Sequence, residues 1–236
     1  MPVNKLAIPD LSGTIGTVGD EGYRIGAEAA RRLTQGGRVR IGPGLTDAEL
    51  DRVEREFGFA FAEDHRAFLR AGLPLNDPDA IVPSEDSLWP YHEWPDWRGG
   101  DRDELRRVLA WPAQGILFDV ECNGFWAATW GSRPAELADA LSDARARLAG
   151  LPQLVPVYAH RYLPSGRGTQ GHPVLSVWQS DTIFYGIDLA DYVTRDFSDA
   201  HRGTPVDHSA ISADLVPFWA DLPGAVRGPW RLGLPD

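Results

Sequence analysis

The chain has 236 residues, 43% of them hydrophobic, and a formal net charge of −11. This length and composition predict a folded domain with a substantial core and argue against a disordered chain. The negative charge argues against nucleic acid as a direct ligand, because phosphate binding requires clusters of basic residues. It favours a basic partner, although an acidic surface also serves solubility alone.

Targeting and redox features point to the cytoplasm. The first residues, Met1 to Lys5, lack the basic and apolar regions of a secretory signal. No stretch approaches the roughly 18 apolar residues of a membrane span. Cys122 is the only cysteine, so an internal disulfide is impossible and the thiol fits a reducing compartment. We therefore expect a cytoplasmic protein that does not enter membranes.

A helix is predicted near the start of the chain. Ile25, Ala29 and Leu33 recur at spacings of four residues. This spacing places the three apolar side chains on one helical face, so we expect a short helix over 22–35. Because the preceding residues show no sustained period, 1–39 is interpreted as a partly irregular N-terminal extension.

Two more helices are predicted after this extension. Thr46 lies three residues before Glu49, which forms a capping box, in which each side chain bonds the backbone N–H of the other residue. Gly58 can end the helix that starts there. A further helix is expected over about 62–71, and Gly72 stops it.

The segment 75–104 combines acidity with aromatic residues. It holds nine acidic residues and two arginines, a net charge of −7 out of the chain's −11. Its prolines forbid a long helix or a central strand, so we expect an ordered irregular loop that ends in a helix at about 101–109. The predicted partner contacts are acidic and aromatic side chains of this loop: Glu85, Asp86, Trp89, Tyr91, Glu93, Trp94, Asp96 and Trp97.

Two interpretations of these side chains stay open. Rigid aromatic residues often dominate protein interfaces, and exposed carboxylates steer a basic partner. The alternative is that the aromatic side chains cover the core beneath a long loop, since buried tryptophans are common.

A β-hairpin is predicted over 115–130. Apolar and polar residues alternate from Ile116 to Val120, and Asn123-Gly124 is a typical two-residue turn. Periodicity predicts the remaining elements as a helix with the stripe Leu137, Leu141 and Leu148, strands over 154–158, 173–178 and 182–185, and a helix over 188–197.

This order of elements predicts an α+β fold with a mostly antiparallel sheet and helices packed around it. We expect one domain over 40–197, with 198–236 as a C-terminal tail packing on it. The expected core residues are Phe57, Phe68, Leu69, Phe118, Leu137, Leu141, Val157, Val177 and Ile183.

Candidate chemical motifs are weak. Gly166 to Gly171 matches G-x-G-x-x-G, but no helix is predicted after it, so a hairpin loop is favoured over nucleotide binding. Asp119 and Glu121 would share one face of the predicted strand, where an exposed face is favoured over acid–base chemistry. Cys122 has no cationic activator beside it in the sequence.

The histidines suggest no site either. None of the six lies in a metal-binding motif, and His160 and His172, which flank the glycine loop, are interpreted as a polar surface pair. We expect no catalytic residue, no metal and no cofactor.

Two segments together resemble the SUKH superfamily, named partly after the Smi/Knr cell-wall regulators of yeast. The first fits a pattern of L-T-x-x-E-I/L followed by G-x-x-L-P-x-D-Y-R-x-F-L; it comprises Leu45-Thr46-Asp47-Ala48-Glu49-Leu50, Phe57-Gly58-Phe59 and His65-Arg66-Ala67-Phe68-Leu69. Ala62 stands where the family usually has proline, and His65 where it usually has tyrosine. The second runs over 172–193 and is preceded by the predicted strand at 154–158.

The resemblance covers roughly residues 40–197 and implies an α+β fold with a non-catalytic role. Many bacterial members are immunity proteins, each of which binds a toxin domain, often a nuclease. We therefore expect a protein-binding module with a basic protein partner. The alternatives are a regulatory or scaffolding protein of the same fold, which genomic neighbourhood would separate, and a hydrolase using Asp119, Glu121 or a histidine.

Overall fold

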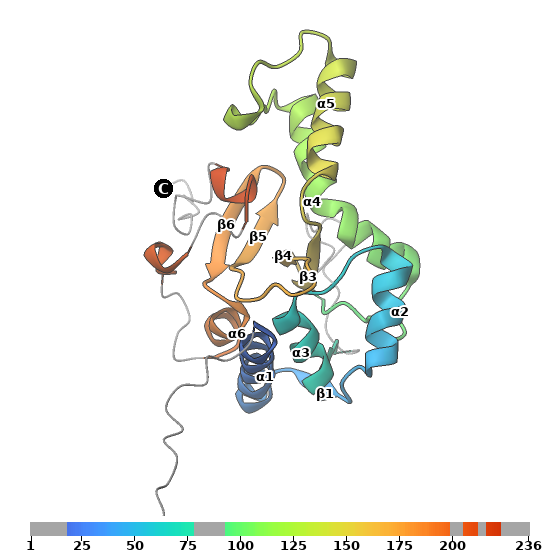
Figure 1. Ribbon diagram of the computed structural model, residues 1–236, viewed down its shortest axis with the longest axis vertical. Coiled ribbons are helices and arrows are strands. Elements are labelled where there is room, and N and C mark those ends of the chain that lie inside the picture. Colours follow the sequence, from blue (N-terminus) through green and yellow to red (C-terminus); the bar gives the residue numbers. More distant parts are fainter. Residues whose placement is uncertain (1–17, 78–92, 199–204, 212–215, 223–236) are drawn as a thin grey trace, which may run out of the picture.

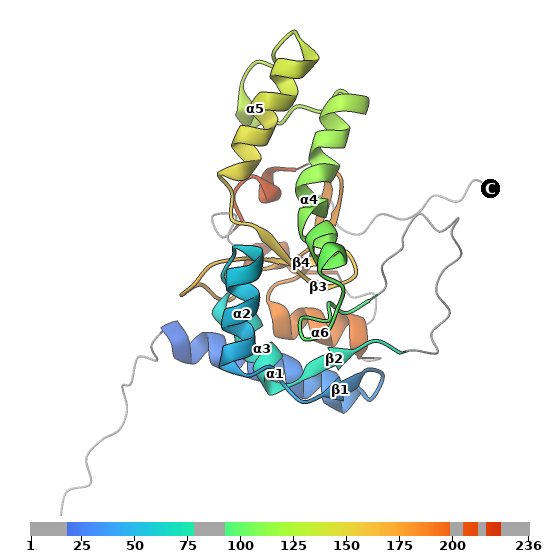
Figure 2. The same cartoon turned by 90° about the vertical axis from the view of Figure 1, so that its right-hand side faces the viewer.

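The computed structural model describes residues 18–77, 93–198, 205–211 and 216–222, and over these ranges it has the expected α+β fold (Figures 1 and 2). The helices are α1 (Val18–Gly36), α2 (Asp47–Phe57), α3 (Glu63–Ala71), α4 (Arg102–Cys122), α5 (Leu137–Ala149) and α6 (Leu189–Phe197). The strands are β1 (Arg40–Gly42), β2 (Leu73–Leu75), β3 (Leu154–Tyr158), β4 (Arg161–Pro164), β5 (Val174–Trp178) and β6 (Asp181–Gly186). Short 3-10 turns lie at Ala128–Trp130, His208–Ala210 and Trp219–Asp221.

Both sheets are antiparallel. The larger has the order β3-β4-β5-β6, and the smaller pairs β1 with β2. The three strands predicted for the second half of the chain are confirmed as β3, β5 and β6. Sequence patterning missed β4, which has only four residues and ends at Pro164. Because β4 joins β3 to β5, the sheet forms a meander.

The two faces of the larger sheet bury side chains in different hydrophobic clusters. Val155 and Leu163 belong to a cluster that includes residues of α1, α2, α3 and α6. Tyr162 and Leu175 belong to a second cluster, which includes residues of α4, α5 and the segment 216–222. The sheet is therefore covered on both sides, which explains why every residue of β4 and all but the last residue of β5 are buried.

The first helix is part of this core. Ile25, Ala29 and Leu33 are buried in the first cluster, as the spacing of four predicts. At Gly26, an added Cβ would lie 2.1 Å from the backbone oxygen of Asp64, so only glycine allows α1 to approach α3 so closely. The boundary expected at residue 40 therefore falls inside one continuous hydrophobic core.

The expected hairpin over 115–130 is wrong, because α4 continues from Arg102 to Cys122. Its buried residues recur at helical spacing: Leu105, Leu109, Pro112, Ile116, Asp119 and Val120. Ile116 and Val120 fit both the strand alternation and an i, i+4 helical stripe, whereas Phe118 is 47% exposed. The Asn-Gly pair marks the end of the helix: Asn123 is its C-cap, and Gly124 has a φ of 67°.

The proline inside α4 depends on the sheet for its hydrogen-bond balance. Pro112 has no N–H for the carbonyl of Val108, one turn earlier. The hydroxyl of Tyr162 on β4 donates to this carbonyl at 3.1 Å. Tyr162 is 1% exposed, so a side chain of β4 that is held in the core replaces the missing helical donor.

Replacing Tyr162 with phenylalanine is therefore expected to lower the free energy of unfolding by about 1–2 kcal/mol, because the partly buried carbonyl of Val108 loses its donor. Chemical denaturation monitored by circular dichroism measures this loss. Tyr23→Phe is the control, because Tyr23 is 62% exposed and should change stability little. Equal stability of the two variants would contradict this account of Pro112.

The predicted core is confirmed in part. Phe68, Leu69, Val157 and Val177 are buried, and Phe57, Leu141 and Ile183 are half-buried. Phe118 and Leu137 are exposed, and their assignment to the core is wrong. The helix predicted around Leu137 exists as α5, but its buried residues are Ala140, Ala144 and Leu148. The packed face of α5 is formed largely by alanines. The sequence prediction instead followed the leucines, which are larger and more apolar.

Candidate functional site

In residues 93–104, the described end of the acidic aromatic segment, the carboxylates and the tryptophans differ in exposure. Glu93 and Asp96 are exposed, whereas Trp94 and Trp97 are 6% and 0% exposed. Glu85, Asp86, Trp89 and Tyr91, which were predicted to contact a partner, lie outside the described residues.

Trp97 is a core residue. Its ring lies 6.0, 5.9 and 5.5 Å from the ring centroids of Phe57, Phe59 and Phe61, in edge-to-face geometry. Trp94 packs against Phe68 and Tyr158 in the same cluster. The expectation that these two tryptophans anchor a partner is therefore corrected: the chain itself buries them, as the core-cover alternative anticipated.

The carboxylates lie on a well-bonded turn. Asp96 Oδ1 accepts hydrogen bonds from the backbone N–H of Arg98 at 3.1 Å and of Gly99 at 2.9 Å. Arg98 in turn donates to Glu49 at 2.6 Å. Hydrogen bonds from Arg98 and Thr46 lower the pKa of Glu49 to about 2. Two contacts therefore hold the turn in place. Arg98 binds the capping-box residue Glu49 of α2, and Trp97 packs into the core.

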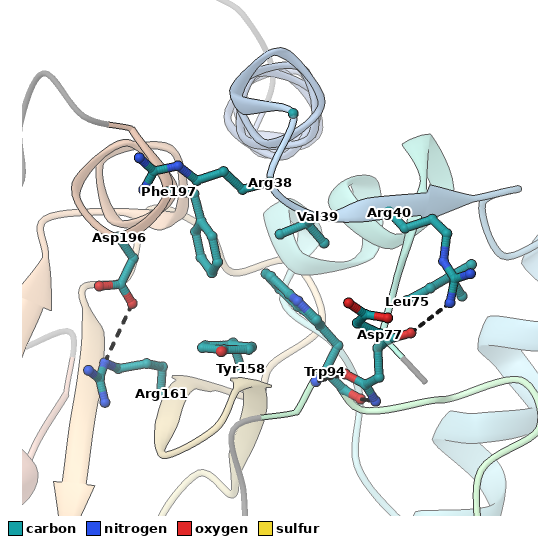
Figure 3. A pocket seen from close by; sticks show the side chains of 12 residues that line it. Arg38, Val39, Arg40, Leu75, Asp77, Trp94, Tyr158, Arg161, Asp196 and Phe197 are labelled. Atoms are coloured by element: carbon teal, nitrogen blue, oxygen red, sulfur yellow. Dashed lines mark hydrogen bonds and ion pairs between the residues drawn. The ribbon is translucent and has the colours of Figure 1, made fainter. Parts of the chain in front are cut away.

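A cleft of about 760 Å³ lies between the β1 and β2 strands, the β3–β4 hairpin and the end of α6 (Figure 3). Charged side chains line it in opposite signs: Arg38, Arg40, Arg161, Asp77 and Asp196. Sequence reasoning missed this site, because its lining residues come from segments up to about 160 positions apart and form no local motif.

Arg161 is the most enclosed cation of this cleft, at 9% exposure. Its guanidinium lies 3.7 Å from the centroid of the Tyr185 ring, its Nη1 donates to Ser176 at 3.3 Å, and its Nε lies 4.0 Å from Asp196. A stacked and ion-paired guanidinium has little freedom to reorient, so one wall of the cleft is pre-formed.

The glycine motif lies in the loop between antiparallel strands β4 and β5, and β5 follows it where a nucleotide site requires a helix. This agrees with the predicted hairpin loop. The loop is bonded to α3 at several points. The N–H of Gly168 donates to Glu63 at 3.0 Å, Glu63 N donates to Thr169 O at 2.8 Å, and the N–H of Gly171 donates to Asp64 at 2.9 Å.

Burial makes the charged form of the Asp64 carboxylate unfavourable in this position. It is fully buried, and desolvation raises its pKa from 3.8 to about 6, against the hydrogen bonds from Gly171 and His65. Because the pKa is raised on folding, the contribution of Asp64 to the free energy of unfolding is fully present below pH 3.8, where the carboxyl is protonated. This contribution is lost as the pH rises through about 6.

Asp64→Asn is expected to remove this pH dependence while keeping an oxygen acceptor for Gly171. Relative to the wild type, the variant should gain up to about 3 kcal/mol of unfolding free energy between pH 4 and pH 7. Urea denaturation at both pH values measures the difference. The same difference in unfolding free energy between variant and wild type at both pH values would contradict the raised pKa of Asp64.

The other candidates for chemistry are dispersed. Asp119 is buried, accepts from Asn123 Nδ2 at 2.6 Å and from Ser180 N at 2.8 Å, and so joins the end of α4 to the β5–β6 turn. Glu121 is exposed on another face of α4, because two residues along a helix do not share a face. Cys122 is exposed.

The histidine environments differ. His172 is buried, which lowers its pKa, so the expectation that it forms a surface pair with His160 is wrong for His172. His65 is 1% exposed beside the ring of Phe61. Over the described ranges, no three potential metal-ligating side chains gather into one site.

Comparisons of the chain with protein-family models, curated proteins and solved structures find no match. Among helices in the described part of the chain, none has both the length and the apolar character needed to cross a membrane.

Proposed function

We propose that this chain is a non-catalytic protein-binding module, most concretely an immunity protein that neutralises a bacterial toxin, with a nuclease as the leading class. The observation that carries the proposal is the concentration of acidic residues in the segment 75–104, where four described carboxylates are exposed next to two buried tryptophans. Glu93, Asp96, Asp101 and Asp103 are all exposed there.

Charge complementarity supports a basic partner. A nuclease presents a basic cleft for the phosphates of its substrate, and exposed carboxylates can occupy that cleft in their place. Because Trp97 packs residues 93–104 against the core, docking on these residues would order few additional backbone groups. The negative charge of the segment thus accelerates encounter with a basic partner, and the fixed backbone of residues 93–104 limits the entropic cost of the complex.

The arrangement of the candidate chemical groups also favours binding over catalysis. Asp119 bridges a helix end and a strand turn, and Asp64 holds the glycine loop. Each therefore has a structural partner that accounts for its position. His65 is enclosed in the core, where a substrate does not reach it.

The test is capture of a partner from a lysate of the native host, followed by a functional assay of what is captured. We expect a basic protein whose expression alone arrests growth, and whose toxicity one equivalent of this chain suppresses. For the nuclease assignment, the captured protein should cleave nucleic acid, and the chain should block cleavage at equimolar concentration. Captured proteins that are harmless to cells, or that stay fully active with an excess of the chain, would contradict the proposal.

A further inference from the structure

We propose that the cleft shown in Figure 3 is a binding site for a small aromatic carboxylate. Its volume of about 760 Å³ lies in the range of small-molecule sites, which is about 300–1,000 Å³. This inference rests on the cleft alone and does not depend on the protein partner proposed above.

Aromatic side chains from three distant segments form the base of the cleft. The ring of Trp94 lies 4.8 Å from Tyr158 and 5.2 Å from Phe197, and Tyr158 lies 5.4 Å from Phe197. Asn76 fixes the backbone of Trp94 on both sides: Trp94 N donates to its Oδ1 at 2.7 Å, and its Nδ2 donates to Trp94 O at 3.0 Å. A planar aromatic ring can pack on this base without reordering it.

The charges of the lining favour an anion with a single charge. Three arginines face two aspartates, a surplus of one positive charge. Arg161 is 9% exposed and lies beside Asp196, whereas the side chains of Arg38 and Arg40 are exposed at the rim, where an anion in the cleft can reach them.

Arg40 has the geometry for carboxylate recognition. Its Nη2 donates to the backbone oxygen of Asn76 at 2.8 Å, which holds the guanidinium beside the cleft and uses one of its five N–H groups. A planar guanidinium matches a carboxylate with two parallel hydrogen bonds. An aromatic ring on the base would thus bring an attached carboxylate toward this rim.

The experiment uses the full chain with ¹⁵N-labelled tryptophan and two unlabelled probes, indole-3-acetate and indole-3-acetamide. The probes share a ring and differ in charge. The indole N–H signal of Trp94, assigned with Trp94→Phe, should shift saturably with the acid at a dissociation constant below about 1 mM. The amide should bind about tenfold more weakly or worse, because it lacks the charge-assisted hydrogen bonds.

The double variant Arg38→Gln/Arg40→Gln should bind the two probes within about twofold of each other, since the preference comes from the rim guanidinium groups. Arg145→Gln is the matched control, because Arg145 is an exposed arginine of α5 that does not line the cleft, and it should keep the full preference. No shift of the Trp94 signal, equal affinity for acid and amide in the wild type, or an undiminished preference in the double variant would each overturn the proposal.

Discussion

Trp97→Ala is expected to lower the free energy of unfolding by about 3–5 kcal/mol, the cost of truncating a fully enclosed aromatic side chain. Trp97 is 0% exposed and contacts three phenylalanine rings. Its removal leaves a cavity between the turn before α4 and the phenylalanine rings at and after the end of α2. The surrounding side chains can fill this cavity only partially. Guanidinium denaturation measures the loss.

Tyr23→Ala supplies the comparison for this prediction, because it truncates an aromatic side chain that is 62% exposed, and we expect less than about 1 kcal/mol of change. A Trp97→Ala protein as stable as the wild type would mean that Trp97 is available to a partner and that its place in the core is wrongly assigned.

The second large effect is the acid sensitivity conferred by His65. Burial lowers the pKa of His65 from 6.5 to about 3, so the folded chain does not take up a proton there when the unfolded chain does. A lowered pKa means that the stability contribution is present above pH 6.5 and is lost as the pH falls through about 3. Over the whole window the loss is about 5 kcal/mol.

His65→Phe is expected to abolish this loss, because phenylalanine does not titrate. The difference in unfolding free energy between variant and wild type should shift by about 3 kcal/mol in favour of the variant between pH 7.5 and pH 4.5. Phe61→Leu, which alters the neighbouring ring without removing a titrating group, should destabilise equally at both pH values. If His65→Phe behaves as Phe61→Leu does, His65 is accessible to protons in the folded state.

Asp64 and His65 oppose each other across part of this range. The buried carboxyl favours acid and the buried imidazole disfavours it, as their shifted pKa values require. The wild-type stability profile between pH 4 and pH 6 is therefore flatter than either single variant suggests. Each contribution is separated by comparing its own variant with the wild type at matched pH.

Local signals predicted the elements that are stabilised by local contacts. The capping box of Thr46 and Glu49 forms as expected, with mutual side-chain to backbone hydrogen bonds, and Gly58 ends α2 in the left-handed conformation. The strand containing Val157 also follows its pattern, since its side chains face two buried layers.

The failure at α4 has a definite physical cause. A proline at 112 and an Asn-Gly pair at 123–124 are ordinary signs of a helix break and a hairpin. Tertiary structure overrides the first sign, because Tyr162 supplies the donor that Pro112 lacks. The second sign is ambiguous, since the same residues also cap helices.

The candidate sites were predictable only where charge is local. The acidity of 75–104 is visible in the sequence, but the inward orientation of Trp94 and Trp97 depends on rings contributed by α2, α3 and β3. The cleft joins residues near 38, 76, 158 and 196, and no spacing within the chain relates them. Its guanidinium groups are distinguished from other surface arginines by their neighbours alone.

The most direct test of the proposed function is the salt dependence of the association rate between this chain and its captured partner, measured by surface plasmon resonance. One variant neutralises the carboxylates of the acidic segment: Glu85→Gln, Asp86→Asn, Glu93→Gln and Asp96→Asn. A control variant changes the net charge equally with exposed carboxylates elsewhere: Glu121→Gln, Glu136→Gln, Asp139→Asn and Asp181→Asn.

We predict that the first variant associates about tenfold more slowly at low ionic strength, with a flatter salt dependence, because the charges that steer the encounter are lost. The control should slow association far less. Equal association rates and salt slopes for both variants, with folds intact by circular dichroism, would contradict the assignment of the acidic segment as the surface that meets the partner.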